Sequence, residues 1–188
     1  MKKIKLVASL SSLVAVGGGT AIAATGCKDE NTPHPEPEDK RNYIVYDGEV
    51  EYFDYVFDQR DIDFLSTVGG YIYIKGKECA VEKLSEIYIK STQNVTWLGD
   101  NFLRGCLHLT AIDLSGLKEV KTIGNYFLYE CSALEKLDLS AISEIESIGS
   151  SFLYKCTLLY DINFSNFKSV KTIGSYFMWQ CNAITRFN

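Results

Sequence analysis

The sequence predicts an α/β repeat solenoid, a stack of coils with short parallel strands on one face and short helices or 3-10 turns on the other. The first observation is a 25-residue unit that recurs without insertions over residues 95–188, the last copy being truncated. The second is that single columns of this unit keep one residue class from copy to copy. Because one unit cannot bury its own apolar face, such units stack on one another. The repeated columns are Leu98, Ile123, Ile148 and Ile173; Gly99, Gly124, Gly149 and Gly174; Phe102, Phe127, Phe152 and Phe177; and Cys106, Cys131, Cys156 and Cys181.

Residues 1–26 have the composition of a targeting segment. Three lysines precede an apolar run from Leu6 to Val16 that continues through small residues. The sequence Ala24-Thr25-Gly26-Cys27 resembles the bacterial lipobox, which implies that Cys27 is acylated and anchors the protein to the outer face of the cell membrane. The alternatives are an ordinary secretory signal and a permanent transmembrane helix. Three glycines at 17–19 interrupt the apolar run and disfavour the helix.

Residues 27–42 are interpreted as an acylated cysteine followed by a linker. The tract from Lys28 to Arg41 holds all three prolines of the chain and no large apolar residue, so it favours an extended spacer over a core. The alternative is a bound recognition tail. The net charge is −5, or −8 without the three leader lysines. This balance argues against nucleic acid and anionic lipid as direct partners, since both require clustered Lys and Arg.

Residues 43–94 are predicted to cap the stack. The stretch from Tyr43 to Phe57 is rich in Tyr, Val and Phe, which favours a hairpin or a degenerate first coil. A Gly69-Gly70 turn leads to a short strand over 71–74. Leu84, Ile87 and Ile89 lie one period before apolar residues of the first full unit, so they indicate the strand half of an earlier repeat. The alternative is a separate acidic element that binds cations, although its carboxylates lack the spacing of a calcium loop.

Each full unit contains two predicted elements. The first half carries a Leu-x-x-Leu-x-Leu strand pattern, as in Leu134, Leu137 and Leu139. The second half opens with a glycine and then a residue suited to cap a helix N-terminus. We therefore expect a helix of one or two turns in every unit. These capping residues are Asp100, Asn125, Ser150 and Ser175.

The unit IGNYFLYECSALEKLDLS resembles the bacterial leucine-rich repeats of the BspA-like type. Two departures concern local turns. The family's Ala before Phe is replaced by Asn101 in the first unit, and the proline often found after the strand is missing. Together with the lipobox and the spacer, the resemblance implies a surface lipoprotein of a wall-less, mycoplasma-like bacterium.

The cysteine column predicts buried free thiols. Spaced cysteines in a secreted protein would ordinarily suggest disulfides. Equivalent side chains of stacked coils point in parallel, however, and pairing them would distort the register. We expect the thiols to act as small hydrophobic groups, and the spacing gives no indication of a metal site.

Ligand binding is expected where the repeat varies, because the constant columns serve stacking. One candidate binding face follows the outward strand positions Tyr88, Asp113, Lys136, Asp138, Asp161 and Asn163. The other candidate is an aromatic stripe, of a kind enriched at interfaces, with the alternative that its rings simply cover the convex side. The stripe residues are Tyr126, Tyr129, Tyr154, Tyr176 and Trp179.

The sequence contains no pattern of catalytic residues, and no cofactor or metal is expected. Asp113 and Asp138 are one period apart, as a repeated column produces, and no other unit repeats the pairing of His108 with Cys106. The leading hypothesis is a non-enzymatic surface module that binds a protein or glycan in adhesion or host interaction. The alternatives are a structural protein that self-associates through an open C-terminal repeat edge, and a fragment of a longer repeat protein.

Overall fold

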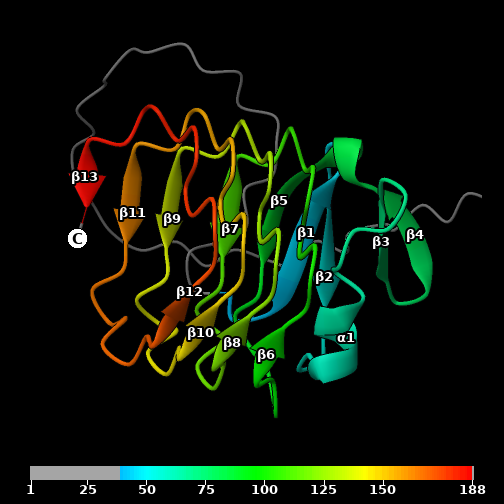
Figure 1. The fold of residues 1–188 in the computed structure, drawn as a ribbon. Coiled ribbons are helices and arrows are strands. Elements are labelled where there is room, and N and C mark those ends of the chain that lie inside the picture. Colours follow the sequence, from blue (N-terminus) through cyan, green and yellow to red (C-terminus); the bar gives the residue numbers. More distant parts are fainter. Residues whose placement is uncertain (1–38, 188) are drawn as a thin grey trace, which may run out of the picture. The chain divides into compact units, whose positions relative to one another are not determined.

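The computed structural model describes residues 39–187, within a compact unit that spans 32–188. The leader, Cys27 and the linker up to residue 38 lie outside the described residues. The described chain forms a β-solenoid whose coils follow the 25-residue period (Figure 1). No helix of the described residues is long and apolar enough to cross a membrane.

One strand from each coil builds the predicted strand face (Figure 1). The strands pair in parallel with a register shift of one period, so that Glu86 lies opposite Ala111 and Lys136 opposite Asp161. The ladder is interrupted once, between β7 and β9, which leaves two sheets on this face. The five strands are β5 (Leu84–Tyr88), β7 (Ala111–Asp113), β9 (Lys136–Asp138), β11 (Asp161–Asn163) and β13 (Arg186–Phe187).

A second parallel sheet, which we did not predict from the sequence, runs along another side of the coils. Its strands are two residues long and contain the apolar column that precedes each repeated glycine. The glycines allow close stacking, because a Cβ at Gly149 would lie 2.5 Å from the carbonyl carbon of Gly124. The four strands are β6 (Trp97–Leu98), β8 (Thr122–Ile123), β10 (Ser147–Ile148) and β12 (Thr172–Ile173).

The helices predicted in the repeats are absent from the described residues, and consecutive turns replace them. In these turns alternate residues have positive φ, for example 60° at Tyr126, 49° at Leu128 and 61° at Glu130. Such a backbone cannot make helical hydrogen bonds, so its amides bond to neighbouring coils. The Tyr126 amide donates to Ser150 at 2.9 Å, and the Leu128 amide donates to Phe102 at 2.9 Å.

The residues predicted as helix caps instead join successive coils. Asp100 Oδ1 accepts the backbone N–H of Asn125 at 2.7 Å, and Asn125 Oδ1 accepts that of Ser150 at 2.8 Å. Ser150 Oγ continues the ladder by accepting the amide of Ser175 at 3.2 Å. A helix cap likewise places a side-chain oxygen beside an unpaired amide. The same residue types therefore suit a helix cap and a bridge between coils, and the local sequence does not distinguish the two.

Residues 43–94 contain the strands that their sequence favours. β1 (Asn42–Tyr46) and β2 (Glu49–Phe53) form a hairpin, and β1 continues the sheet by pairing antiparallel with β5. The turn at Gly69-Gly70 leads into β3 (Tyr71–Ile74), which pairs with β4 (Lys77–Ala80). The cap also holds the only helices of the described residues, α1 (Gln59–Asp63) and the 3-10 turn η1 (Val81–Lys83).

The constant columns fill the core. Phe102, Phe127, Phe152 and Phe177 stack with centroid separations of 5.5, 5.0 and 5.1 Å. The described cysteines are free thiols, as predicted, and all except Cys181 are buried. Cys131 Sγ donates to the carbonyl of Leu103 at 3.2 Å, and burial raises the pKa of this thiol. The thiols therefore contribute packing and weak hydrogen bonds.

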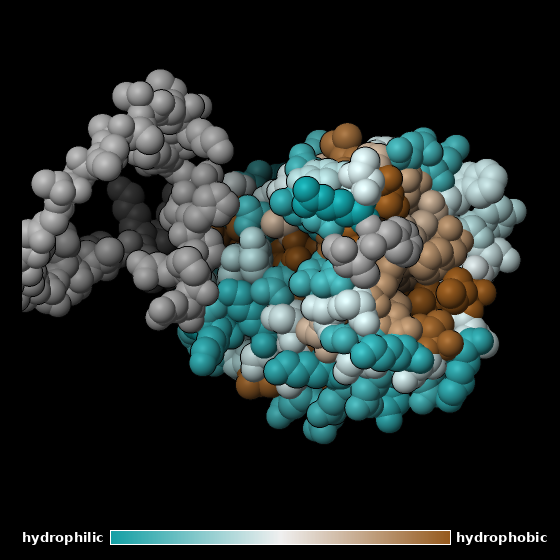
Figure 2. Space-filling view, turned by 90° about the vertical axis from the view of Figure 1, so that its left-hand side faces the viewer, coloured by the Kyte–Doolittle hydropathy of each residue, from teal (hydrophilic) through white to brown (hydrophobic). Residues whose placement is uncertain are grey.

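The last coil exposes residues that preceding coils bury. Ile148 is 3% exposed and Ile173 is 56% exposed, although they occupy one column. Tyr176 and Trp179 are exposed as well, at 60% and 53%. Figure 2 looks onto this end of the stack, where hydrophobic residues reach the surface.

Candidate binding face

The outer side of the strand face begins with a row of tyrosines. Tyr52, Tyr43 and Tyr88 lie directly opposite one another on β2, β1 and β5, and Asp113 on β7 continues the row. The rings of Tyr43 and Tyr88 are stacked 4.1 Å apart. Burial raises the pKa of both hydroxyls above the ordinary tyrosine value, because it disfavours the phenolate form. Tyr88 was predicted as a site residue, whereas Tyr43 and Tyr52 were not, because their pairing with β5 depends on the hairpin.

Two cationic side chains cover these rings. The Arg41 guanidinium lies 4.0 Å from the centroid of Tyr52, and Lys90 Nζ lies 5.4 Å from that of Tyr43. The tyrosines of β2 and β1 are thus covered by cationic side chains of the protein itself, because cations are attracted to ring faces.

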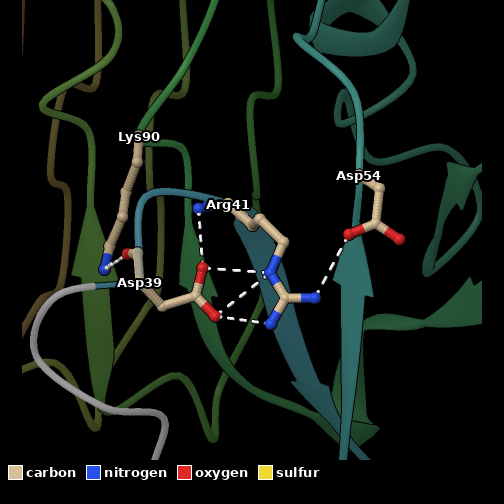
Figure 3. Close-up of polar contacts among 4 residues, drawn as sticks. All are labelled: Asp39, Arg41, Asp54 and Lys90. Atoms are coloured by element: carbon tan, nitrogen blue, oxygen red, sulfur yellow. Dashed lines mark hydrogen bonds and ion pairs between the residues drawn. The ribbon is translucent and has the colours of Figure 1, made fainter.

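Arg41 also fixes the start of the described chain. Its guanidinium lies between Asp39 and Asp54, at 2.6 Å and 3.1 Å (Figure 3). Lys90 Nζ donates to the Asp39 carbonyl at 2.7 Å. The hydrogen bonds from Arg41 lower the pKa of Asp39 to about 2. Residue 39, near the end of the predicted linker, is therefore tied to the strand face.

The other predicted site residues lie on β9 and β11. Lys136 is opposite Asp161, and Asp138 is opposite Asn163, so all four share a face. Asp161 also lies 3.9 Å from Arg186 of β13. All six predicted positions thus lie on strands of the strand face, and the break between β7 and β9 divides them into two groups.

That break forms a cleft of about 410 Å³. Its lining includes Asp113 and Asp138 together with the half-buried Ile112. Neither carboxylate takes part in an ion pair within residues 39–187. The cleft therefore combines uncompensated negative charge with apolar surface. Its lining is Ile112, Asp113, Ser115, Asp138, Ser140 and Ala141.

One column accounts for the cleft. Gly116 packs so closely on the preceding coil that a Cβ would lie 2.7 Å from the carbonyl oxygen of Ile89. One period later Ala141 carries a Cβ, which prevents the same approach to the coil of β7. At the next position Asn166 compensates, because its side-chain amide donates to the Ser140 carbonyl at 2.6 Å. Ala141 has neither the small size of Gly116 nor the bridging amide of Asn166.

The acidic residues also have a structural role that sequence reasoning missed. Oδ1 of Asp113 accepts the amide of Ser115 at 2.8 Å, and Oδ1 of Asp138 accepts that of Ser140 at 2.8 Å. Asn163 does the same with Ser165 at 3.0 Å. Asp or Asn two residues before Ser, repeated at each strand end, is the signature of such turns. The second carboxylate oxygen is the one available to a ligand.

The aromatic stripe forms a continuous series of contacts on the side of the turns. Tyr129 and Tyr154 stack at 4.8 Å, and Tyr176 meets Trp179 edge-on at 5.9 Å. The Arg104 guanidinium lies 4.9 Å from the centroid of Tyr126. The rings thus pack over neighbouring coils and are still partly exposed. Only the contact between Tyr129 and Tyr154 is a face-to-face stack, and the other contacts along the stripe are edge-on, so ring surface stays exposed at Tyr176 and Trp179.

The side chains of the described residues that could suggest catalysis or metal binding do not lie together. His108 is exposed, whereas Cys106 is fully buried. Within residues 39–187 no three His, Cys, Asp or Glu side chains form a group that could hold a metal ion. The acids of the cap, the alternative cation site, are partly engaged by cations, as in the contact of Asp47 with Lys83 at 3.0 Å.

Comparison with known proteins agrees with the repeat architecture. Residues 54–188 match the family model described as the BspA type leucine rich repeat region, in six copies. The match begins inside the cap, before the first complete 25-residue unit. No curated protein and no solved structure is detectably similar to the chain.

Proposed function

Because the chain belongs to the BspA-type leucine-rich-repeat family, we propose that it is a non-enzymatic binding module whose strand face contacts a protein or glycan ligand. The observation that carries the proposal is the cleft between β7 and β9, where two unpaired carboxylates flank apolar surface. Such a site suits a ligand that donates hydrogen bonds or carries positive charge beside an apolar group. Leucine-rich repeats typically serve as binding or scaffold modules, and fold alone does not specify the ligand.

Residues 32–188 are a suitable fragment for testing binding. They form one compact unit, and their hydrophobic core runs from Ile44 to Ile162, so we expect this segment to fold by itself. It would be applied to an array of immobilised extracellular-matrix proteins and host glycans. The expected result is saturable binding to at least one component.

Variants of the cleft test whether the captured ligand binds at this site of the protein. Asp113→Asn with Asp138→Asn removes the charge and keeps the turn, since Asn163 makes the same turn one unit later. Losing two charge-assisted contacts should weaken binding about 10-fold or more. Glu119→Gln, an exposed carboxylate outside the strand face, is the matched control. Absence of any ligand, or loss of binding with Tyr126→Ala in the stripe but not with the cleft variants, would overturn the proposal.

We further propose that the module is displayed as a lipoprotein, anchored by lipid on Cys27 at the extracellular face of the cell membrane, and acts in adhesion or host interaction. The lipobox-like sequence and the mycoplasma-like arrangement of leader, spacer and repeats support this proposal. Metabolic labelling of the full chain with a palmitate analogue in a bacterial host tests it. Label should enter the wild type and Cys79→Ser but not Cys27→Ser. An unlabelled wild type would contradict the anchor.

A further inference from the structure

We propose that the second sheet carries a binding site for neutral glycans, built around the indole ring of Trp97. Trp97 is the first residue of β6 and is 46% exposed, whereas its neighbour Leu98 is buried. The equivalent outward positions of the next two coils are Thr122 and Ser147, so stacking of the repeat does not require an aromatic side chain there. Trp97 is therefore a variable residue on a constant frame, where binding is expected.

The ring of Trp97 has no partner within the described part of the chain. Other exposed rings do have partners, since Tyr55 packs edge-on against Phe53 at 6.3 Å and Phe64 lies 5.4 Å from the Arg60 guanidinium. Trp97 makes neither kind of contact, and its indole N–H has no hydrogen-bond acceptor among residues 39–187. Exposed ring surface and a free donor are thus available to a ligand.

The ring is also not what holds the neighbouring helix in place. The side chain of Gln59 in α1 bonds to the backbone of β6, because its Nε2 donates to the Trp97 carbonyl at 3.0 Å and its Oε1 accepts the Thr96 amide at 3.1 Å. These bonds and α1 cover one edge of β6, and β8 pairs with the other edge (Figure 1). A peptide therefore cannot add to β6 as a further strand, and a ligand must be recognised through side chains.

Trp97 lines an open depression of about 480 Å³ across β6 and β8. This volume is within the range of small-ligand sites, roughly 300–1,000 Å³. The depression places the apolar indole ring next to several polar groups. Besides Trp97, its lining includes Asp100, Lys121, Thr122, Gly99 and Gly124.

The polar groups of the depression keep hydrogen-bonding capacity for a ligand. Asp100 Oδ1 accepts the Asn125 amide at 2.7 Å, whereas Asp100 Oδ2 and the Thr122 hydroxyl have no hydrogen-bond partner among the described residues. Lys121 Nζ lies 3.8 Å from Glu144, and an ion pair of two exposed side chains holds neither of them firmly. The lining contains one acidic and one basic group, so it suits an uncharged ligand, in contrast to the two carboxylates of the cleft.

These features fit the pyranose ring of a neutral glycan. Such a ring presents C–H groups on a flat face and hydroxyl groups around its edge. The C–H face packs on the indole ring, whose face is negative and whose burial is favourable. The hydroxyl groups both donate and accept, so they can bond to the Asp100 carboxylate, the Thr122 hydroxyl and the Lys121 ammonium group. A charged or a purely apolar ligand would use only part of the site.

Tryptophan fluorescence tests the proposal directly, because Trp97 and Trp179 are the two tryptophans of the chain. In residues 32–188 carrying Trp179→Phe, the tryptophan emission reports on Trp97 alone. This protein would be titrated with neutral trisaccharides of glucose, galactose, mannose and N-acetylglucosamine, up to about 10 mM, a range that covers weak binding. At least one of these glycans should change the emission saturably.

Variants tested by calorimetry on the glycan that binds locate the site. Trp97→Thr introduces the residue that the next unit carries at this position, so the strand is preserved, and it should weaken binding about ten-fold or more. Trp97→Phe keeps an aromatic ring and should bind more tightly than Trp97→Thr. Tyr71→Thr is the matched control, because Tyr71 is an aromatic residue of another strand and is 40% exposed. This control and the cleft variant Asp113→Asn with Asp138→Asn should bind like the wild type.

An unchanged Trp97 emission with all of these glycans would overturn the proposal. So would glycan binding that survives Trp97→Thr, and if the cleft variant abolished that binding, the glycan would belong to the cleft. Capture of a protein through Trp97 without binding of any glycan would also overturn it and would indicate a protein interface. A denaturation curve for each variant confirms that it is folded. The cleft is tested with its own ligand, so failure here leaves the proposed function intact.

Discussion

The substitution Gly149→Ala tests whether the glycine column sets the spacing of the coils. A Cβ at this position would lie 2.5 Å from the carbonyl carbon of Gly124 and 2.6 Å from the amide nitrogen of Asn125. Ordinary carbon contacts are about 3.5–4.0 Å, so the two coils must separate by about 1 Å. Both clashing atoms belong to the backbone and cannot turn aside.

The expected loss combines three terms. Overpacking of this kind costs about 1–3 kcal/mol. Separation also weakens two hydrogen bonds, Gly149 N to Ile123 O at 2.8 Å and Ser150 N to Asn125 Oδ1 at 2.8 Å, each contributing about 0.5–1.5 kcal/mol. Alanine lowers the conformational entropy of the unfolded chain relative to glycine, which offsets about 0.4–1 kcal/mol of this loss. The free energy of unfolding should therefore fall by about 3 kcal/mol, which lowers Tm by roughly 6–12 °C.

The same column supplies the control. At Gly99 a Cβ would meet only the Ser66 hydroxyl, at 3.2 Å, and that side chain can rotate away. Urea denaturation of residues 32–188, followed by circular dichroism, should show a near-normal midpoint for Gly99→Ala and a strongly lowered one for Gly149→Ala. Equal midpoints for the two variants would refute the close-packing argument.

Three further measurements test other parts of the structure. Asn125→Ala should lower stability by about 1–3 kcal/mol in urea denaturation, because it leaves the Ser150 amide unpaired, and Asn125→Ser should restore part of the loss. Among the cysteines of the repeated column, maleimide labelling of the native protein should modify Cys181 first, because this thiol is half-buried and a hydrogen bond with a neighbouring thiol lowers its pKa. Ready labelling of the other cysteines of the column would contradict their burial. In an NMR titration Arg41→Ala should return the pKa of Asp39 from about 2 toward its ordinary 3.8. Because the pKa of Asp39 is lower in the folded state than in the unfolded state, the stability that this contact contributes is present above pH 3.8 and is lost as pH falls toward 2.

Much of the fold could be predicted from the repeat alone. A constant period requires equivalent residues to superpose, so the pairing of Lys136 with Asp161 follows from their 25-residue separation. The stacked Phe127 and Phe152 and the buried Cys131 follow from the same argument. The strands of residues 43–74 could be predicted because a composition rich in Tyr, Val and Phe favours strands and two glycines mark a turn.

The candidate site was only partly predictable. Outward positions such as Asp113 and Asp138 follow from strand alternation, and the structure places them on one face. The cleft between them has no local signature, because it depends on how closely Ala141 can approach the neighbouring coil. Tyr43 joins Tyr88 only through the antiparallel pairing of β1 with β5, which joins segments far apart in the sequence.

By itself the sequence determined the period, the buried columns and the parallel register, because identical units must bury identical faces against each other. Only the tertiary structure decided the conformation of the second half of each unit. There the local preference for a capped helix competed with hydrogen bonds to adjacent coils, and the bond from Ser150 N to Asn125 Oδ1 exists only once those coils are stacked. Tertiary structure likewise decided where the cleft between β7 and β9 lies. A difference of one methyl group, as between Gly116 and Ala141, changes the spacing of two coils only where their backbones are in close contact.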